Sequence, residues 1–233
     1  MTDTVEDRTD AVPRLGVRER KAHATRRRLL ASALDLMARE GTDAVTVRVV
    51  ADHSDIATGT FYNYFPSAEA LIEAVIDLEI GTMGRRLDAL SNGIDDPADE
   101  LSAALRHLVR ASITDPTWGW LLVRLGSESE WVATLLGARL ARTVERGATT
   151  GRFIVKDVPT ATAMTLGALV AATRVFLDAG RALGEAESSF VENQLRALGI
   201  TPAEAERIAN RRLPELPIIA DQGAMSIVRI IAL

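Results

Sequence analysis

Residues 46–65 read TVRVVADHSDIATGTFYNYF, and this stretch decides the fold that the sequence predicts. Thr46 can cap a helix, and Ile56 supplies an apolar residue directly after a polar turn. A second, very short helix is predicted over residues 57–62. A helix, a tight turn and a short second helix form the arrangement that inserts one helix end into the DNA major groove. The sequence therefore favours DNA recognition.

The segment before this stretch predicts an amphipathic helix over Val17–Glu40. Apolar residues between positions 30 and 37 recur at helical spacing, and Gly41 supplies the stop. The opposite face carries Arg26, Arg27 and Arg28. Two interpretations stay open: at least one of these arginines contacts a phosphate, or the three form an ordinary solvated helix face.

The charge of the chain is unevenly distributed. The formal net charge of the 233 residues is −5, yet the segment from Arg14 to Arg48 holds nine basic residues against four acidic ones. Attraction to phosphates depends on the local field rather than on the total charge. The overall acidic balance therefore does not exclude DNA binding.

The residues expected to meet DNA lie at the helix starts and on the short helix. Hydroxyl and amide groups at a helix edge suit phosphates and base edges, and a glycine beside a small residue lets the backbone approach closely. The predicted DNA-contacting set is Arg26, Thr46, Arg48, Ala57, Thr58, Gly59, Thr60, Tyr62, Asn63 and Tyr64.

Some residues in this region have two interpretations. Tyr62 is the preferred contact because so short a helix leaves little core for it to join, whereas Tyr64 can equally pack inside. Arg48 can reach either a phosphate or a base. His53 is interpreted as a helix-end residue, and the two phenylalanines of the stretch are expected in the core.

The chain after residue 65 reads as helical throughout. Pro66 and Ser67 open a helix that continues to about Leu90, and the loop beginning at Ser91 marks the boundary with the remaining bundle. Further helices are predicted over about 101–109, 118–125, 131–146, 159–177, 188–198 and 201–211. No alternation typical of strands is long enough to build a sheet.

The predicted fold class is all-α: an N-terminal three-helix DNA-binding domain with a helix-turn-helix, plus a C-terminal helical ligand-binding and dimerisation bundle. The expected divisions are a disordered tail over 1–16, the DNA-binding domain over 17–66, the effector-binding and dimerisation domain over 67–212, and a tail of uncertain role over 213–233. That last tail is apolar. Three interpretations stay open: it packs on the dimer, it covers a groove, or it is a non-native extension.

A ligand cavity in such a bundle is expected between the core helices. The candidate lining residues are Leu105, Leu108, Trp118, Trp120, Leu121, Arg124 and Met164. Arg124 is a candidate partner for an anionic group, and His107 is a weak polar candidate. The alternative is that most of these side chains simply fill the core.

Small residues in the long helix over 159–177 predict close packing against a second copy of the chain. The candidate interface residues are Gly167, Ala171, Phe176, Phe190 and Leu195. Residues 161–177 are alternatively a membrane span, but they are rich in small residues, contain Arg174 and are short for a bilayer, so we expect an interface helix and no membrane contact. A two-fold dimer places two readers roughly 34 Å apart and requires a near-palindromic operator.

The N-terminal unit resembles the tetracycline-repressor (TetR) family over about Thr25–Val75. The matching residues are Val47, Ala51, Ile56, Gly59-Thr60-Phe61-Tyr62, Tyr64-Phe65, Pro66-Ser67, Glu69 and Leu71. The resemblance implies a homodimeric transcriptional regulator, usually a repressor, whose C-terminal domain binds a small molecule and releases double-stranded DNA. It implies no cofactor, and the effector is not named by the sequence.

The sequence departs from the family pattern in three places. Ser54-Asp55 replaces the usual Ala-Gly of the turn, Ala68 replaces a lysine that resembles a phosphate anchor, and Val49 replaces an acidic residue. Aspartate tolerates the left-handed conformation but adds negative charge near DNA. Loss of one phosphate contact is expected to lower the salt dependence of binding by about one unit of slope.

Other classes of protein find less support in the sequence. The chain has no cysteine, which excludes disulfides and thiolate metal sites and fits a cytoplasmic location. An enzyme would need a convergent catalytic set, and Glu128, Glu130 and His107 come with no nucleophile motif, phosphate loop or metal spacing. The remaining alternative is a helical small-molecule-binding or protein-interaction dimer whose DNA binding has been weakened or lost.

Overall fold

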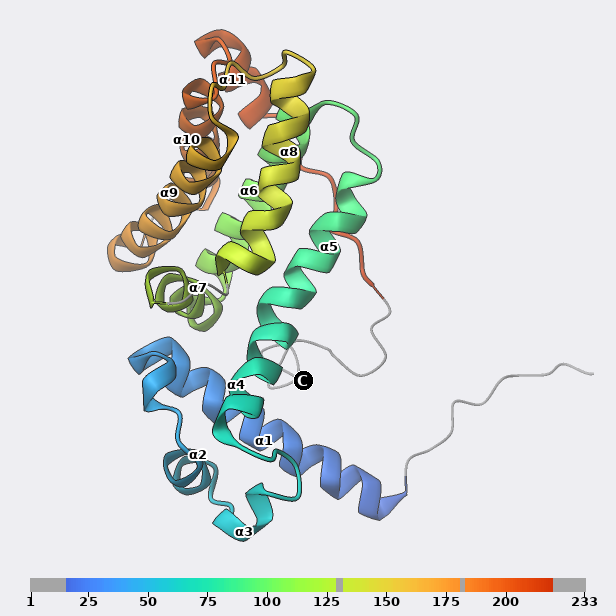
Figure 1. The fold of residues 1–233 in the computed structure, drawn as a ribbon, viewed down its shortest axis with the longest axis vertical. Coiled ribbons are helices and arrows are strands. Elements are labelled where there is room, and N and C mark those ends of the chain that lie inside the picture. Colours follow the sequence, from blue (N-terminus) through green and yellow to red (C-terminus); the bar gives the residue numbers. More distant parts are fainter. Residues whose placement is uncertain (1–15, 129–131, 181–182, 220–233) are drawn as a thin grey trace, which may run out of the picture.

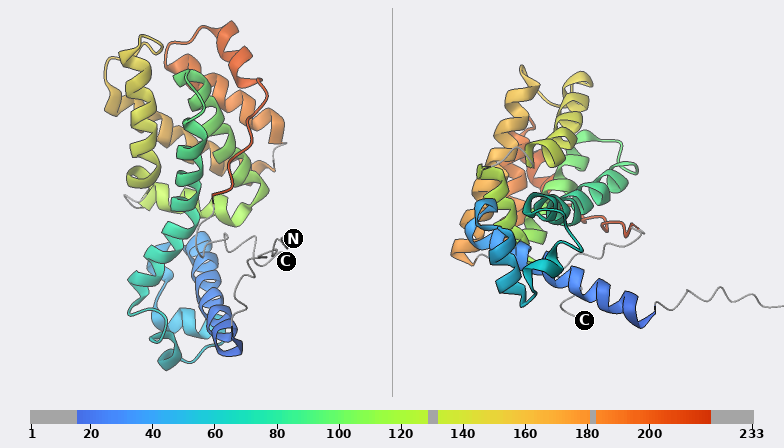
Figure 2. Two further views of the ribbon diagram at one scale, coloured as in Figure 1. Left: turned by 90° about the vertical axis from the view of Figure 1, so that its right-hand side faces the viewer. Right: turned by 60° about the horizontal axis from the view of Figure 1, so that its bottom comes forward.

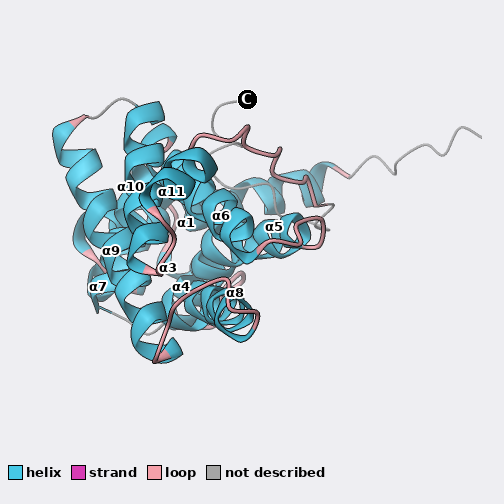
Figure 3. Ribbon diagram, turned by 90° about the horizontal axis from the view of Figure 1, so that it is seen from above, coloured by secondary structure: helices cyan, strands magenta, loops and turns pink. Residues whose placement is uncertain are grey.

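The computed structural model describes residues 16–128, 132–180 and 183–219, and every regular element within these ranges is a helix (Figure 3). This confirms the all-α prediction. The predicted tails over 1–15 and 220–233, and Trp131 at the expected start of a helix, lie outside the described residues.

The N-terminal unit consists of α1 (Val17–Glu40), a 3₁₀ turn η1 (Thr42–Ala44), α2 (Val47–Ser54) and the short α3 (Thr58–Phe61) (Figure 1). The range predicted for the first helix is confirmed at both ends. The Thr46 hydroxyl accepts a hydrogen bond of 3.3 Å from the Val49 backbone N–H, so the predicted helix cap is also confirmed. The core of the unit holds fully buried side chains from all three helices, Leu29, Met37, Val50 and Phe61.

A long rod connects this unit to the rest of the molecule (Figures 1 and 2). It comprises α4 (Ala68–Ile76), a π-helical turn η2 (Asp77–Gly81) and α5 (Thr82–Ser91), and the backbone stays helical across both junctions. The Ser67 hydroxyl caps its start by accepting a 3.3 Å hydrogen bond from the Ala70 N–H. The sequence predicted one helix to about Leu90; the structure adds the π-helical turn within it.

The remaining helices form a bundle, with α5 at its side (Figure 1). They are α6 (Pro97–Thr114), α7 (Pro116–Glu128), a π-helical turn η3 (Ala133–Gly137), α8 (Ala138–Thr149), α9 (Val158–Ala179), α10 (Leu183–Ala197) and α11 (Pro202–Ala209). Helix α6 packs against α7, α8, α9 and α10 and is the centre of the bundle. Helix α10 begins at Leu183 rather than at the predicted Ser188. Buried Ala186 and Glu187 extend it, because the Glu187 carboxylate pairs with two arginines of α6.

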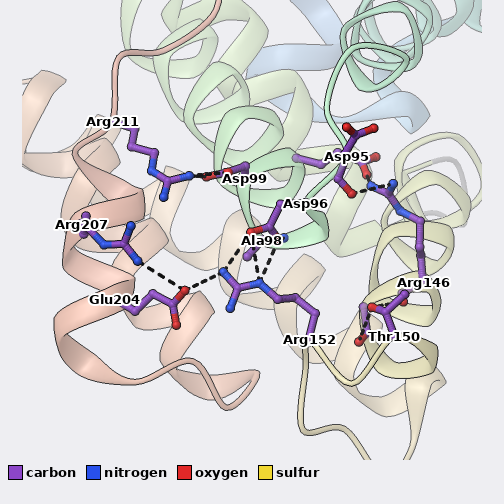
Figure 4. Close-up of polar contacts among 12 residues, drawn as sticks. Asp95, Asp96, Ala98, Asp99, Arg146, Thr150, Arg152, Glu204, Arg207 and Arg211 are labelled. Carbon is purple, nitrogen blue, oxygen red and sulfur yellow. Dashed lines mark hydrogen bonds and ion pairs between the residues drawn. The ribbon is translucent and has the colours of Figure 1, made fainter.

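Ion pairs link neighbouring segments at the end of the bundle that lies farthest from α3 (Figures 1 and 4). The Arg152 guanidinium contacts the Asp96 carboxylate at 2.9 Å and the Glu204 carboxylate at 2.9 Å, and Arg211 pairs with Asp99. Burial raises the pKa of Asp96, but hydrogen bonds from Arg152 and from a backbone N–H outweigh burial and hold it below its ordinary value. Arg152, in the loop after α8, thus links the residue before α6 to α11. Arg211, just after α11, links back to the first turn of α6.

Residues 213–219, here called the C-terminal strap, run without regular structure down the bundle along α6 and α5 (Figure 2). His107 on α6 is 2.9 Å from the carbonyl of Pro214, and Arg86 on α5 donates to the carbonyls of Leu216 and Pro217 at 3.2 and 2.9 Å. The described part of the predicted tail therefore packs on its own protomer.

Candidate DNA interface and ligand cavity

The turn between α2 and α3 is a tight helix-capping turn. Asp55 lies in the left-handed region at φ 51° and ψ 50°, and its N–H bonds the Asp52 carbonyl at 3.2 Å. The Ile56 N–H bonds the Ala51 carbonyl at 2.9 Å. This pair of bonds is the Schellman motif, in which glycine is the usual left-handed residue. Asp55 thus occupies the left-handed position that aspartate tolerates.

Helix α3 lies at the end of the molecule opposite the bundle (Figure 1), and its residues Thr58 and Gly59 are exposed. Tyr62 is 55% exposed, and its ring meets buried Phe61 edge-on at 5.6 Å between centroids. A Cβ placed on Gly59 would meet nothing within 4 Å, so the backbone there is open to a partner. The exposed predicted contacts on and beside α3 are Ala57, Thr58, Gly59, Tyr62 and Asn63, whereas Thr60 and Tyr64 are half-buried.

The other predicted contacts come from α1 and from the start of α2. The Arg26 guanidinium lies 5.1 Å from the centre of the Phe65 ring. Arg48 is exposed and forms a weak ion pair with Asp52 at 4.0 Å, and Thr46 is exposed although its hydroxyl caps α2. Arg48 and Thr46 thus lie exposed at the start of α2, and Arg26 makes a cation–π contact with Phe65.

A cavity of about 440 Å³ lies between α5, α6, η3, α8 and α9. Most of its wall is aliphatic, formed by Leu87, Leu101, Ala104, Leu105, Leu108, Leu136, Leu140, Leu166 and Leu169. The remainder is polar, formed by Asp88, Ser91, Asn92, Glu100, Arg139, Arg142, Thr143 and Arg146. An apolar cavity with a few convergent polar groups is the usual form of a small-molecule site.

The polar wall is already ordered by its own contacts. The Asp88 carboxylate receives Arg139 at 2.8 Å and Arg142 at 2.9 Å. The Glu100 carboxylate receives the Thr143 hydroxyl at 2.9 Å and also pairs with Arg146. The donors all lie on α8, and the carboxylates lie on α5 and α6. Because these contacts between helices restrain the side chains, the hydrogen-bonding groups that line the cavity are held in fixed positions.

Gly84 makes room for one of these arginines. A Cβ built on Gly84 would lie 2.6 Å from the Cζ atom of Arg139, closer than real contacts allow. The guanidinium therefore packs directly on the backbone of α5. This contact ties the cavity wall to the rod that carries the DNA-binding unit.

Two of the seven predicted ligand residues, Leu105 and Leu108, line this cavity; the other five do not. The indole N–H of Trp118 points to the Glu79 carbonyl at 3.4 Å, and Arg124 donates to the Arg39 carbonyl at 2.8 Å. Leu121 is fully buried, Met164 is 65% exposed, and Trp120 is half-buried. Helical periodicity identifies an apolar face but does not say whether a cavity or a neighbouring helix covers it.

The sequence analysis missed the polar wall, above all Asp88, Arg139 and Arg142. One signal was available: α8 carries arginines at 139, 142 and 146, spaced so that they share one helix face. That spacing is equally typical of a solvated surface. Only the packing of α8 against α5 and α6 places these arginines at the cavity.

The predicted interface residues divide into two groups. Gly167 and Ala171 are exposed on α9, beside Met164 at 65% and Val175 at 56% exposure. Phe176 and Phe190 are 7% exposed and Leu195 is fully buried. Packing within the protomer accounts for most of the burial of these three side chains.

Helix α9 is long and apolar enough to cross a membrane by length and composition alone, with a mean hydropathy of 1.4 and 28% of its most apolar window buried. It packs against α7 and α8. Within the described ranges, no group of three His, Cys, Asp or Glu side chains is arranged to hold a metal ion.

A helix-turn-helix that presents a short polar helix, joined by a rod to a bundle with a cavity, defines a DNA-binding regulator with a sensor domain. The comparisons with known proteins give the family. Residues 29–75 match the family described as "Bacterial regulatory proteins, tetR family", and residues 96–211 match "Tetracyclin repressor-like, C-terminal domain". The chain belongs to the TetR family of transcriptional regulators and is not an enzyme.

Individual relatives agree with this assignment. The structure of RolR in complex with resorcinol is similar with a TM-score of 0.65 and 38% identity, covering 85% of this chain and 99% of that one. The HTH-type transcriptional repressor KstR of Mycobacterium tuberculosis is 28% identical over 130 residues, 52% of this chain and 59% of KstR. FadR of Bacillus subtilis, solved with stearoyl-CoA, shares the fold with a TM-score of 0.61 at 17% identity.

Proposed function

We propose that this regulator represses transcription in the cytoplasm by binding a near-palindromic operator as a homodimer, and that a small molecule in the cavity releases it. The observation that carries the proposal is the position of the cavity. Its wall includes Leu87 and Asp88 of α5. Helix α5 continues through η2 into α4, which packs on α1 of the N-terminal DNA-binding unit, here called the reader. A ligand that moves α5 therefore changes the position of the reader.

The reading surface is assigned to α3 and its flanks. Tyr62 and Asn63 supply base-edge and phosphate contacts, Gly59 permits close approach, and Arg48 contributes a cation from the start of α2. The full proposed set is the one predicted from the sequence, with Tyr64 and Arg26 in supporting positions because both pack on the core.

The effector is proposed to be a small, largely apolar molecule with hydroxyl groups, of the dihydroxybenzene class. A hydroxyl can donate to Asp88 or Glu100 and accept from Arg139 or Arg142, so the polar wall suits a neutral molecule that does both. The likeness to RolR, whose structure holds resorcinol, supports this class. The aliphatic wall accommodates the ring.

The dimer is proposed to form through the exposed face of α9. Gly167 and Ala171 allow close approach of two backbones, and Met164 and Val175 supply apolar area that the protomer leaves uncovered. Ala171→Arg places a charge in the middle of this face and is expected to yield monomers in analytical ultracentrifugation. Arg196→Ala, an exposed change on α10, serves as the control. A dimer that survives Ala171→Arg contradicts the assignment.

The test of the whole proposal is selection of genomic DNA fragments with purified protein, followed by binding to the recovered site across a salt series. A near-palindromic site with steep salt dependence, released by resorcinol or a related phenol, supports the proposal. Resorcinol binding without recovery of any site favours the alternative of a ligand-binding dimer that has lost DNA binding. A site that no phenol releases rejects the proposed effector class.

A further inference from the structure

The turn that aims α3 is held by a residue from another helix. Arg28, on α1, donates through Nη2 to the Ser54 carbonyl at 2.5 Å and lies 3.4 Å from the Asp55 carbonyl. These two carbonyls belong to the last residue of α2 and to the left-handed residue of the turn. The guanidinium thus joins α1 directly to the α2–α3 turn.

Three other carbonyls near the end of α2 already accept hydrogen bonds. The Schellman bonds use Ala51 and Asp52, and the Ser54 hydroxyl folds back to the Val50 carbonyl at 2.7 Å. The last carbonyls of a helix otherwise lack intrahelical partners, and a cation is favourable at this negative end of the helix. Arg28 supplies a charged donor to the Ser54 and Asp55 carbonyls at this end of the helix.

Asp55 makes the turn dependent on the hydrogen bonds from Arg28. Its φ of 51° is disfavoured for a residue with a Cβ and is readily adopted by glycine. The Arg28 guanidinium lies 3.8 Å from the Asp55 carboxylate, but both groups are largely exposed, so the ion pair itself contributes little. The bonds to the backbone carbonyls are therefore the main contribution.

We propose that Arg28 is a positioning residue for DNA reading, and that the chain requires it because Asp55, rather than glycine, occupies the left-handed position of the turn. This inference rests on the proposed role of α3 as the reading helix. Without Arg28, the turn opens more readily and α3 loses its fixed direction. With glycine at position 55, the turn forms unaided and Arg28 becomes dispensable.

The competing explanation is that Arg28 is a phosphate contact, and salt dependence separates the two. Removing a phosphate contact flattens the slope of log affinity against log salt by about one unit. Removing a positioning contact weakens binding and leaves that slope unchanged. Arg27, exposed and adjacent, provides a matched control that loses the same charge.

The experiment is a double-variant cycle on the full-length protein with the selected operator: wild type, Arg28→Ala, Asp55→Gly, the double variant and Arg27→Ala. Arg28→Ala is expected to weaken binding about tenfold, as loss of about 1.4 kcal/mol would, with an unchanged salt slope. In the Asp55→Gly background the same change is expected to cost less than about twofold. Equal losses in both backgrounds with a flattened slope would overturn the proposal.

A second readout does not depend on DNA. Hydrogen exchange of the peptide covering residues 51–60 is expected to accelerate in Arg28→Ala and to return to the wild-type rate in the double variant. Unchanged exchange in Arg28→Ala would also overturn the proposal. If wild-type protein selects no operator, the proposed function fails while this exchange cycle still tests the turn.

Discussion

Arg124 on α7 donates a hydrogen bond of 2.8 Å to the main-chain carbonyl of Arg39, in the last turn of α1. Helix α7 belongs to the sensor bundle and α1 to the DNA-binding unit, and the two helices pack against each other. A cation at a helix C-terminus is favourable, so this bond fixes the end of α1 to the bundle. On the same helix, Trp118 contacts the Glu79 carbonyl in η2.

We expect Arg124→Met to weaken the communication between cavity and reader. The methionine retains most of the packing and removes the bond to Arg39, so ligand binding should be unchanged while release of the operator by the ligand falls several-fold. The measurement is operator affinity with and without resorcinol, beside resorcinol affinity of the free protein. Arg196→Met, which changes an exposed arginine on α10, is the control. Unchanged release would show that the contact is not part of the coupling.

Tyr62→Ala is expected to weaken specific operator binding about 5- to 150-fold while the dimer remains folded. The side chain is 55% exposed, so little core packing is lost, whereas a base-reading contact is worth about 1–3 kcal/mol. Operator affinity and thermal unfolding are the two measurements. Tyr62→Phe separates the hydroxyl from the ring. Retained affinity in Tyr62→Ala would contradict the assignment of this residue.

Ala104→Phe is expected to fill the cavity and block ligand binding without preventing operator binding. Ala104 is half-buried and lines the cavity, so the added ring extends into empty space rather than into packed core. Titration calorimetry with resorcinol and operator binding in its presence are the measurements. Ala104→Ser keeps the volume and should behave as wild type. Normal ligand binding by Ala104→Phe would place the effector elsewhere.

Stability is expected to depend on the charge of His107. Burial lowers its pKa below the ordinary value of 6.5; the Pro214 carbonyl opposes this shift, and Arg110, Arg86 and Arg106 add to it. Between the lowered pKa and 6.5 the unfolded chain binds the proton more readily than the folded one. The stability that neutral His107 contributes is therefore fully present above pH 6.5. It is lost as the pH falls through the pKa of His107 in the folded protein, by up to about 1.4 kcal/mol per pH unit.

His107→Gln tests this dependence, because the amide can still donate to Pro214 but does not titrate. In denaturant unfolding, the free energy of unfolding of wild type minus that of the variant should fall as the pH is lowered from 7.5 toward 5. The difference between the two proteins isolates His107 from Asp115, whose pKa burial raises despite hydrogen bonds from the backbone. Parallel pH profiles for the two proteins would contradict the expected linkage.

Much of the fold was predictable because helices are specified by nearby residues. The ends of α1, the Thr46 cap, the Ser67 cap and the left-handed Asp55 each depend on contacts within a few positions along the chain. The exposure of Tyr62 and Asn63 follows from equally local features, because a four-residue helix leaves little core for the residues beside it to join. The assignment to a family then followed from the spacing of these residues.

The burial of the candidate cavity and interface residues was harder to predict from the sequence. Burial of Leu121 and exposure of Met164 follow from which helices pack together, and periodicity alone identifies neither the neighbour nor the gap between neighbours. Phe176, Phe190 and Leu195 are apolar at regular spacing, as interface residues are, but so are core residues. Asp88 and Arg139, far apart in the sequence, give no signal until α5 and α8 meet.

The sequence by itself determined the all-helical class, the helix-turn-helix and the family, because capping, periodicity and turn chemistry act between residues close along the chain. Only the tertiary structure decided which side chains line the cavity and which bonds hold the reader in place. Arg28 reaches a carbonyl 26 residues away and Arg124 reaches one 85 residues away. An arginine can bond any accessible carbonyl, so its partner is set by the packing of whole helices and is not encoded in the neighbouring residues.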